Sequence, residues 1–536
     1  MSSHSTRQRR PAEAQSPAGS AVTLRYHDLT RHSYDSVRER PHTLDWENQP
    51  STSKRYLDLG RQPLPPEMLP GLPPTWELLR RLSSPASLPA RSACGLAELA
   101  ALCYLGYGTT ARKAYPGFVS TLRAAPSAGA LYPCELYVCL RGVTDLADGV
   151  YHYAQADHSL TCLRQGDFLP YLRAASGDAP SLDGADIVLA ISTIWWRSSW
   201  KYRDRAYRYC LNDTGHLAGN LLLAGRALGY RTAVVYDFLD ADVNDLLGLD
   251  AGREATLALV ACSTGGPSGA LPASLPPLAA IRPAHRPLSA QEVAYPTITE
   301  AHSATCFSGA AALQEVRGRG RGNEPLPSPY LPAGDLPSFL LPDPAAARSA
   351  QPLSETIALR RSSRRFARRP ISVEVLSKVL AAAVVAYPSD QAAAVLPDVA
   401  VIVNDVTGLP PGGYRYDAAG RRLVQTQVGA LRQKVAYLSL EQRLCGDAAA
   451  SIFFVADLQR GAALGGERSY RRTYIDAGLR GELIYLAGRA LGLGCSGIGA
   501  FYDDEAASFW DLEPGSRVIY ELVVGPETAD QGTGGG

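Results

Sequence analysis

The hexapeptide Ala-Gly-Arg-Ala-Leu-Gly at Ala224–Gly229 returns at Ala487–Gly492, 263 positions further along the chain. The same offset brings other motifs into register without a gap from about 148 to 263. The aligned pairs are Tyr151 with Tyr414, Tyr207-Arg208 with Tyr470-Arg471, Asp213 with Asp476, Phe238 with Phe501, and Leu257–Cys262 with Tyr520–Gly525. Several matches at one offset indicate that the chain contains two copies of one structural unit.

Both copies have the same order of expected elements. A helical run and a Pro-containing segment precede a strand, a hairpin and a second strand, and a long helix and a closing strand complete the unit. The long helix of each copy is expected to end at Gly229 or Gly492, as glycine favours the end of a helix. Because strands and helices do not alternate strictly, the pattern predicts an α+β fold. The expected strands are 135–140, 187–192, 399–403 and 450–456, and the expected long helices are Leu217–Leu228 and Leu479–Leu491.

The amino-acid composition of the regions outside the two copies indicates how the rest of the chain is organised. The region between the copies is rich in Pro and Ala, which is typical of an extended linker. The region before the first copy contains too many aromatic residues for a simple tail, so we expect it to pack on a domain. The predicted organisation is a disordered tail (1–24), an N-terminal extension (25–90), a first domain (91–267), a linker (268–350), a second domain (351–528) and a tail (529–536).

The bulk properties exclude several classes of function. A net charge of +1 gives no electrostatic basis for binding nucleic acid or an anionic membrane. No apolar run approaches the length of a membrane span, and the N-terminus lacks the apolar core of a signal peptide, so a cytoplasmic protein is expected. The ten cysteines include no Cys-x-x-Cys pair, which favours reduced thiols over a zinc site or a disulfide framework; no metal site is predicted.

Two motifs suggest chemistry. Residues Arg360–Phe366 read Arg-Arg-Ser-Ser-Arg-Arg-Phe, and their forked guanidinium groups and hydroxyls suit a phosphate monoester, although a solvated basic turn has the same composition. Residues Pro126–Pro133 read Pro-Ser-Ala-Gly-Ala-Leu-Tyr-Pro, whose small residues allow close approach to a flat ring, or form an ordinary turn. A third pattern, Gly492-x-Gly494-x-x-Gly497, follows a helix and enters a strand, which is the reverse of a dinucleotide fingerprint.

The first two motifs resemble the phosphate and isoalloxazine elements of the nitroreductase superfamily. The segment PSAGALYPCELYV, the extension YHDLTRHSY…LDWENQP, and Lys201-Tyr202 followed by RAYRY resemble the SagB-type azoline dehydrogenases within it. The resemblance implies two fused nitroreductase-like domains forming an intramolecular pseudo-dimer. It also implies an FMN-dependent oxidation of thiazoline or oxazoline rings in a ribosomally synthesised peptide, in an enzyme of antibiotic biosynthesis.

In that superfamily, one subunit supplies the arginine motif and a Gly-rich strand, and its partner supplies the Pro-Ser-Ala-Gly loop. Here the first copy keeps the loop but has a degenerate arginine segment, and the second copy has the reverse, with its loop reduced to Tyr387–Pro397. We therefore expect one composite FMN site per chain and one vestigial site. The predicted cofactor-binding residues are Pro126, Ser127, Ala128, Gly129, Ala130, Arg360, Arg361, Ser362, Arg364, Gly497, Ile498 and Gly499.

The resemblance also makes Lys201 and Tyr202 the candidate catalytic residues, although a surface ion pair is the alternative for Lys201. The second copy has lost this pair, since it has Leu464 and Gly465 at the corresponding positions. Lys201 can act as a base only if its pKa falls well below its usual value of about 10.4. Arg203 and Arg205 are expected to lower it, and Tyr202 is expected to relay the proton or orient the substrate. Reoxidation of the flavin by O₂ would complete the cycle.

Two further features surround the predicted site. The tryptophans Trp195, Trp196 and Trp200 either shield the flavin or belong to the core. Many nitroreductases carry a C-terminal Lys or Arg that reaches the phosphate; none ends this chain, and Arg517 is the candidate replacement.

The resemblance implies a modified precursor peptide and a cyclodehydratase as partners, and the chain is expected to act as a monomeric pseudo-dimer or in a further homo-oligomer. Two other functions are compatible with the sequence. One is an NAD(P)H-dependent nitroreductase or another flavin-dependent desaturase of small molecules. The other is a scaffold without flavin in a peptide-modifying complex.

Overall fold

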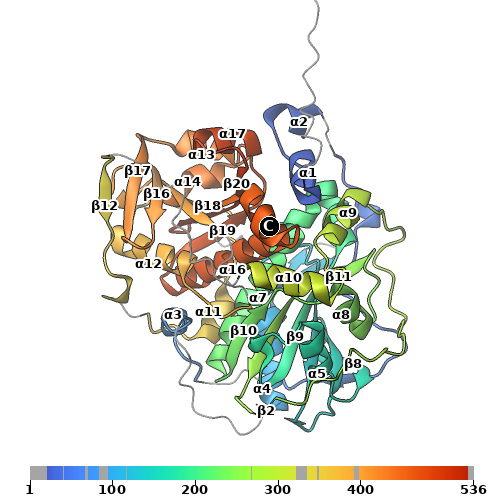
Figure 1. Cartoon of the computed structure of the whole chain (residues 1–536). Coiled ribbons are helices and arrows are strands. Elements are labelled where there is room, and N and C mark those ends of the chain that lie inside the picture. The colour runs from blue at the N-terminus through green and yellow to red at the C-terminus, as the bar shows by residue number, and fades with distance from the viewer. Residues whose placement is uncertain are drawn as a thin grey trace, which may run out of the picture.

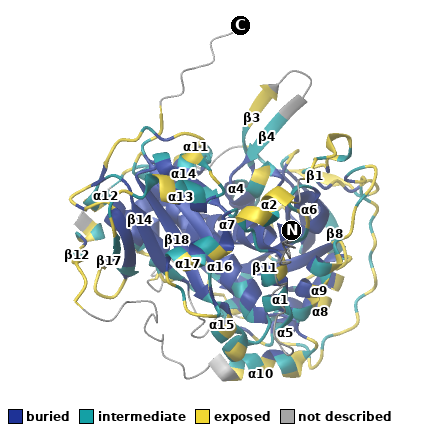
Figure 2. Cartoon of the chain, turned by 90° about the horizontal axis from the view of Figure 1, so that it is seen from above, coloured by how far each residue is buried: buried dark blue, intermediate teal, exposed yellow. Residues whose placement is uncertain are grey.

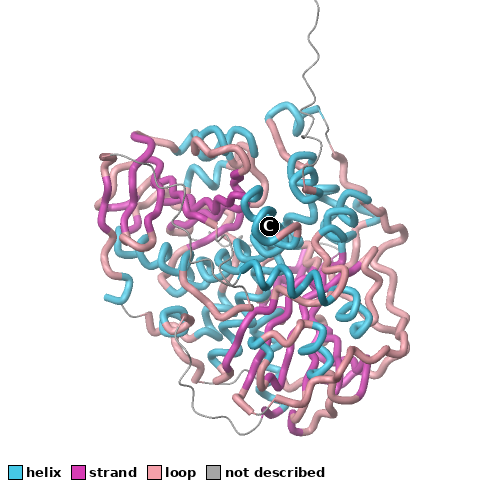
Figure 3. The backbone as a smooth tube through the Cα atoms, viewed as in Figure 1, coloured by secondary structure: helices cyan, strands magenta, loops and turns pink. Residues whose placement is uncertain are grey.

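A computed structural model describes residues 21–39, 42–66, 71–83, 94–115, 118–266, 268–320, 335–346, 349–390 and 397–528 (Figures 1 and 3). Residues 1–20 of the predicted N-terminal tail and all of the predicted C-terminal tail lie outside these ranges. Residues 22–24, also assigned to that tail, already belong to the first helix, α1 (Val22–Leu29).

The first domain is built on a seven-stranded antiparallel sheet in the order β1-β8-β7-β5-β9-β11-β10. Its central strands are buried along their whole length, since helices cover one face and the loops and short helices of the same domain cover the other. The strands are β1 (Arg61–Pro63), β5 (Cys134–Leu140), β7 (Gly149–Ala154), β8 (Ser159–Gln165), β9 (Ala185–Ile194), β10 (Arg231–Val235) and β11 (Glu254–Ser263).

The second domain repeats this sheet in the order β12-β17-β16-β14-β18-β20-β19, again antiparallel. The strands are β12 (Ser338–Leu340), β14 (Asp398–Val403), β16 (Gly412–Asp417), β17 (Arg422–Val428), β18 (Ala450–Asp457), β19 (Gly494–Ile498) and β20 (Ser516–Gly525). The four strands expected from the sequence all form, and the identical strand order confirms the α+β repeat.

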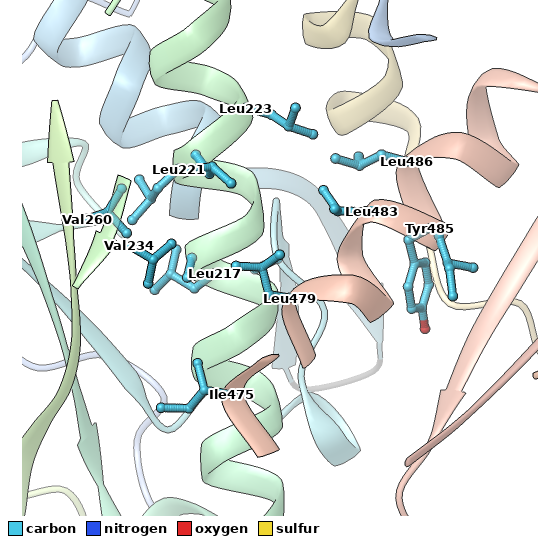
Figure 4. Close-up of a cluster of buried hydrophobic side chains, with 14 of the residues drawn as sticks. Leu217, Leu221, Leu223, Val234, Val260, Ile475, Leu479, Leu483, Tyr485 and Leu486 are labelled. Atoms are coloured by element: carbon cyan, nitrogen blue, oxygen red, sulfur yellow. The ribbon is translucent and has the colours of Figure 1, made fainter. Parts of the chain in front are cut away.

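Two long helices meet at the centre of the molecule: α7 (Ala206–Ala227) from the first domain and α16 (Arg468–Ala490) from the second. Both begin eleven residues before their predicted starts, because their first turns carry polar residues that are buried against the other domain. Gly215 and Gly478 lie where the helices cross, and a Cβ on either glycine would overlap the backbone of the other helix. The crossing is therefore closed by direct backbone contact, and leucines pack along it (Figure 4).

Matching ion pairs lock the two domains together. Arg468 and Arg471 at the start of α16 bind Asp240, the first residue of α8 (Asp240–Leu247) in the first domain. The pseudo-symmetric pair, Arg205 and Arg208, binds Asp503, the first residue of α17 (Asp503–Phe509) in the second domain. All of these side chains are buried, so removing one partner would leave an uncompensated charge.

The N-terminal extension packs across both domains. Helix α1 binds the side chain of Glu467 through the main-chain N–H groups of Val22 and Thr23. The Tyr26 hydroxyl donates to the Asp204 carbonyl in the first domain. Helix α3 (Thr75–Arg80) lies against both α7 and α16. The expectation that this region packs on a domain therefore agrees with its contacts, which reach both.

The segment between the domains contains structure of its own. Helix α9 (Pro296–Ala304) packs on α1, and α10 (Ala310–Gly320) packs on α15 (Leu458–Gly465) of the second domain. Residues 284–288 run beside residues 51–57 through main-chain hydrogen bonds. The predicted linker is thus only partly an extended connector, and its residues 321–334 lie outside the described ranges.

A hairpin formed by β3 (Thr109–Tyr115) and β4 (Phe118–Arg123) projects from the body of the molecule (Figure 2). Buried residues fill the two sheets and the helices between them. The other helices are α2 (Tyr34–Glu39), α4 (Leu96–Tyr107), α5 (Leu169–Ala175), α6 (Trp195–Tyr202), α11 (Leu353–Leu359), α12 (Val373–Val384), α13 (Arg432–Leu438) and α14 (Arg443–Asp447). Two short parallel pairs, β2 (Cys94–Gly95) with β6 (Val143–Thr144) and β13 (Ile371–Ser372) with β15 (Val406–Thr407), complete the fold.

Candidate functional site

The Pro-Ser-Ala-Gly loop is held by an aspartate of helix α7. The Ser127 hydroxyl donates to Asp213 at 2.5 Å, and the Ala128 N–H donates to the same carboxylate at 3.1 Å. Gly129 has a φ of 64°, a left-handed conformation that costs glycine little. A side chain at Gly129 would also meet the Tyr202 hydroxyl and the Lys201 amine. The loop therefore needs a glycine at this position for both its backbone and its contact with α6.

The arginine motif reaches this loop from the second domain. The buried Arg360 guanidinium donates to the main-chain carbonyls of Ala124 and Arg123, at 2.7 and 3.0 Å, just before the loop. Arg361 donates to the carbonyl of Ala358 and to Thr110. These two guanidinium groups thus bind main-chain oxygens, and Arg360 joins the two domains directly.

Arg364 differs from both. Its side chain is exposed, and among the described residues it has no hydrogen-bond or ion-pair partner. The neighbouring Ser362 hydroxyl lies 2.9 Å from the Tyr485 hydroxyl. A free guanidinium beside two hydroxyls is suited to an anionic ligand.

Residues of both domains line one pocket of about 90 Å³, which we call the inner pocket. Of the predicted cofactor residues, Ala130, Ile498, Arg360 and Arg361 do not line it, and the others do. Its lining residues are Pro126, Ser127, Ala128, Gly129, Tyr209, Asn212, Asp213, His216, Ser362, Arg364, Tyr485, Ser496, Gly497, Gly499 and Tyr520.

The inner pocket adjoins a larger outer pocket of about 910 Å³, with which it shares Ser362, Arg364 and Tyr485. The outer pocket is strongly basic, since one described carboxylate, Glu527, faces several cations. These cations are Lys113, Arg360, Arg361, Arg364, Arg365, Arg369 and Arg489. An anionic group would be stabilised here.

Lys201 and Tyr202 end helix α6 beside the loop. Burial lowers the pKa of Lys201 below its usual value, and the positive charge of Arg364 lowers it further. Burial raises the pKa of Tyr202, so this hydroxyl stays protonated. The expectation that Arg203 and Arg205 lower the Lys201 pKa is wrong: the cation that does so is Arg364 from the other domain. Arg205 instead binds Asp503, as described above.

Two other expectations are settled by the contacts. Trp195, Trp196 and Trp200 are buried, and none of them lines the inner pocket, so they belong to the core. Arg517 does not approach the arginine motif. Arg517 stands near the start of β20, at the end of this strand that is far from the motif, and its guanidinium lies 3.5 Å from the carboxylate of Asp28 in the N-terminal extension. Arg517 is therefore not the replacement for a C-terminal phosphate ligand.

Several polar residues of the inner pocket escaped the sequence reasoning. Burial raises the pKa of Asp213 to about 7, against the opposing hydrogen bonds from Ser127 and Ala128. The Tyr209 hydroxyl and the amide of Asn212 are buried and find no hydrogen-bond partner among the described residues. Asp213 was visible as a repeated residue, but only the fold turns this face of α7 toward the other domain.

Described residues occupy the pseudo-symmetric location between the domains, which we call the closed site (Val234, Tyr236, Tyr387, Asp390). Val234 and Tyr236 stand where the inner pocket has Gly497 and Gly499. The Tyr236 and Tyr387 hydroxyls are 2.8 Å apart, and Asp390 accepts hydrogen bonds from the main-chain N–H groups of Tyr236 and Asp237. Tyr387 also donates to Asp476, which is the counterpart of Asp213. Asp476 in turn pairs with Arg480. Residues 391–396 of the reduced loop lie outside the described ranges.

The described residues contain no group of three or more His, Cys, Asp or Glu side chains arranged to hold a metal ion. Nor do they include a helix with the length and apolar character needed to cross a membrane.

Known proteins resemble both domains. A protein described as a nitroreductase from Methanocaldococcus jannaschii is 32% identical over 152 residues, 28% of this chain and 73% of that protein. The microcin B17-processing protein McbC of Escherichia coli is 32% identical over 146 residues, 26% of this chain. The trifolitoxin-processing protein TfxB of Rhizobium leguminosarum bv. trifolii is 30% identical over 140 residues, 25% of this chain. The matches span 53% of McbC and 38% of TfxB.

A crystal structure described as that of a nitroreductase from Anabaena variabilis superposes with a TM-score of 0.76 at 27% identity. The superposition covers 95% of this chain and all of that one. Residues 100–265 and 357–526 each match the Nitroreductase family, which together is more than half of the chain. The chain therefore belongs to the nitroreductase family and carries two domains of that family in tandem.

Proposed function

We propose that this protein is an FMN-dependent dehydrogenase that oxidises thiazoline or oxazoline rings of a ribosomally synthesised peptide to thiazoles or oxazoles. One observation carries the proposal: Lys201 and Tyr202 lie against the Pro-Ser-Ala-Gly loop of the first domain and are electrostatically coupled to Arg364 of the second. Similarity to McbC and TfxB, which are named as processing proteins of microcin B17 and trifolitoxin, supports a peptide substrate.

The residues of the two pockets fit FMN. Gly497 of β19 and Gly499, just after the strand, line the inner pocket, and a Cβ on them would collide with Tyr520 and Tyr209, respectively. The Tyr209 hydroxyl and the Asn212 amide, which have no hydrogen-bond partner in the described part of the chain, can hydrogen-bond a heteroaromatic ring, since a buried polar group without a partner is costly. Arg364 and the basic outer pocket can hold the phosphate. When bound, FMN supplies the acceptor for a hydride.

Lys201 is the proposed base. Because its pKa is lowered, its amine becomes neutral at a lower pH than that of an ordinary lysine and can accept the proton from the ring carbon of the substrate. Tyr202 keeps its proton and can donate a hydrogen bond to the substrate. Both side chains lie beside the loop, since a Cβ added at Gly129 would meet the Lys201 amine and the Tyr202 hydroxyl.

The proposed partners follow from this chemistry. An azoline is the product of cyclodehydration of a Cys, Ser or Thr residue, so a cyclodehydratase must supply the substrate.

The experiment is to incubate a cyclised precursor peptide with the purified protein and measure its mass. We expect the loss of two hydrogens per ring, no loss with Lys201→Ala, and a yellow flavoprotein in both cases. A flavoprotein that leaves the rings unchanged but is bleached by NADPH would instead favour a nitroreductase. A colourless protein that still binds the peptide would favour a scaffold.

A further inference from the structure

Three titratable side chains form a hydrogen-bonded chain across the domain interface, beside the inner pocket. The Tyr520 hydroxyl lies 2.7 Å from His216 Nε2, and His216 Nδ1 lies 2.7 Å from Glu482 Oε2. His216 comes from α7 of the first domain, whereas Glu482 and Tyr520 come from α16 and β20 of the second. We call these three residues the Tyr520 relay.

The relay ends in the pocket. Tyr520 and His216 line the inner pocket, and a side chain at Gly497 would overlap the Tyr520 hydroxyl. Glu482 is fully buried, and the other two side chains are nearly so. Ring-edge contacts of His216 with Tyr485 and Tyr520 fix the imidazole plane.

The pseudo-symmetric position shows that domain packing does not require the relay. The counterparts of His216, Glu482 and Tyr520 are Leu479, Gly219 and Leu257. The same helices cross there with apolar or absent side chains. Burying three polar groups costs desolvation that leucines avoid, so a role of the relay in the adjoining pocket explains why it occurs on one side only.

The hydrogen bonds of the relay have a defined direction. The Asn220 amide, with its nitrogen facing the carboxylate, lies 2.9 Å from Glu482, and Arg360 Nε lies 4.0 Å from it. The Glu482 carboxylate acts as the acceptor in these contacts, so His216 Nδ1–H donates to Glu482 Oε2. The part of the relay that can change is therefore whether His216 Nε2 carries a proton.

A proton on Nε2 reverses the role of Tyr520 in the pocket. When His216 is neutral, Nε2 accepts the Tyr520 hydroxyl proton, and only oxygen lone pairs face the pocket. When His216 is protonated, Nε2–H donates to the Tyr520 oxygen, and the phenolic proton becomes free to point at a ligand.

We propose that the Tyr520 relay takes up one proton when the cofactor in the inner pocket is reduced, and that Tyr520 then donates a hydrogen bond to the reduced cofactor. This inference rests on the proposed function, namely that FMN occupies the pocket. Transfer of a hydride adds two electrons and one proton to the cofactor, which leaves one negative charge on it. A proton from water, bound at His216 Nε2, compensates that charge.

The groups facing His216 come from every element around it. Glu482 and Tyr485 face it from α16, Tyr520 from β20 and Asp213 from the preceding turn of α7. Arg360 approaches Glu482 from the arginine motif.

The test is the pH dependence of the midpoint potential of the purified flavoprotein, measured spectroscopically without peptide between about pH 6 and 8. We expect two protons per two electrons for the wild type and one for His216→Leu, which installs the residue of the pseudo-symmetric position. Tyr520→Phe should likewise lower the proton count, and it tests the same idea with a smaller change if His216→Leu does not fold. Tyr474→Phe is the matched control, because Tyr474 pairs with His27 in the same interface away from the pocket and should leave two protons.

The outcomes separate the two proposals. Two protons in His216→Leu with FMN bound would overturn the relay and leave the dehydrogenase proposal standing. A wild-type protein that binds no FMN would overturn both.

Discussion

The two interdomain sites of this chain lie at equivalent positions of the repeat, but one is a pocket and the other is filled by side chains. At the inner pocket, Gly497 and Gly499 line the same space as a loop of small residues, and Arg364 has no hydrogen-bond or ion-pair partner among the described residues. At the closed site, Val234 and Tyr236 meet Tyr387 and Asp390, and Asp476 pairs with Arg480. The comparison shows that a tandem repeat can keep one site and turn the other into core, since tyrosines and ion pairs stabilise the packing that an open pocket forgoes.

The largest expected effect comes from copying the closed site into the open one. Gly497→Val installs the residue found at position 234, and its side chain would collide with the Tyr520 hydroxyl. We expect loss of bound FMN, measured by absorbance of the purified protein. The matched variant Val234→Gly should leave the flavin content at one per chain. A yellow Gly497→Val protein, or two flavins in the wild type, would contradict the assignment of the sites.

Lys201→Ala should lower the rate of ring oxidation by about 10²- to 10⁴-fold, the usual contribution of a general base. FMN should remain bound. The control is Leu464→Ala, at the corresponding position of the second domain, which should retain full activity. In the wild type, the rate should rise with pH through the lowered pKa of Lys201. A Lys201→Ala enzyme with normal turnover would remove the base assignment.

Asp213 should make the protein less stable as the pH rises. Its pKa is raised to about 7 in the folded protein, so the folded state holds a proton that the unfolded chain releases near its usual value of about 4. Stability is lost across that interval, by on the order of 2–4 kcal/mol.

We expect Asp213→Asn to remove this slope, because the amide stays neutral. The measurement is the free energy of unfolding by urea, for wild type and variant, at several pH values between the two pKa values. Asp476→Asn, in which the altered residue has Arg480 as its partner, is the control and should instead destabilise the protein. Parallel pH profiles of wild type and Asp213→Asn would contradict the raised pKa.

Arg364→Ala should weaken FMN binding by about 10- to 100-fold, as expected for the loss of a charge-assisted hydrogen bond. Equilibrium dialysis of FMN measures the effect. Arg443→Ala, which removes a highly exposed arginine of α14, should not change the affinity. Because Arg364 also contributes to the lowered pKa of Lys201, the pH profile of the variant should shift upward. An unchanged FMN affinity would mean that the other cations of the outer pocket hold the phosphate.

Much of the fold was predictable, because the repeat is explicit in the residues. The offset of 263, the strand segments and the glycines that end α7 and α16 were all visible, and Gly229 and Gly492 adopt the expected left-handed conformation. Patterns of this kind depend on local periodicity and backbone sterics, which neighbouring residues decide. The early starts of the two helices were missed, because Arg205, Arg208, Arg468 and Arg471 look solvated until the opposite domain is placed against them.

The candidate site was only partly predictable. The sequence identified the loop, the arginine motif and the Lys-Tyr pair as separate pieces. It did not separate Arg360, which binds carbonyls at the base of the loop, from Arg364, whose guanidinium is free of described partners. It also assigned the lowered Lys201 pKa to sequence neighbours, when the responsible cation lies in the other domain.

By itself, the sequence determined that this protein is a tandem of two related α+β units whose distinctive motifs are divided between the copies. Tertiary structure alone decided which buried groups face which: that Asp213 holds the loop, that His216 joins Glu482 and Tyr520, and that Tyr236 and Tyr387 fill the second site. The physical reason is that hydrogen bonds and charge interactions act over a few ångströms in space. Residues more than 200 positions apart become neighbours only when α7 and α16 cross.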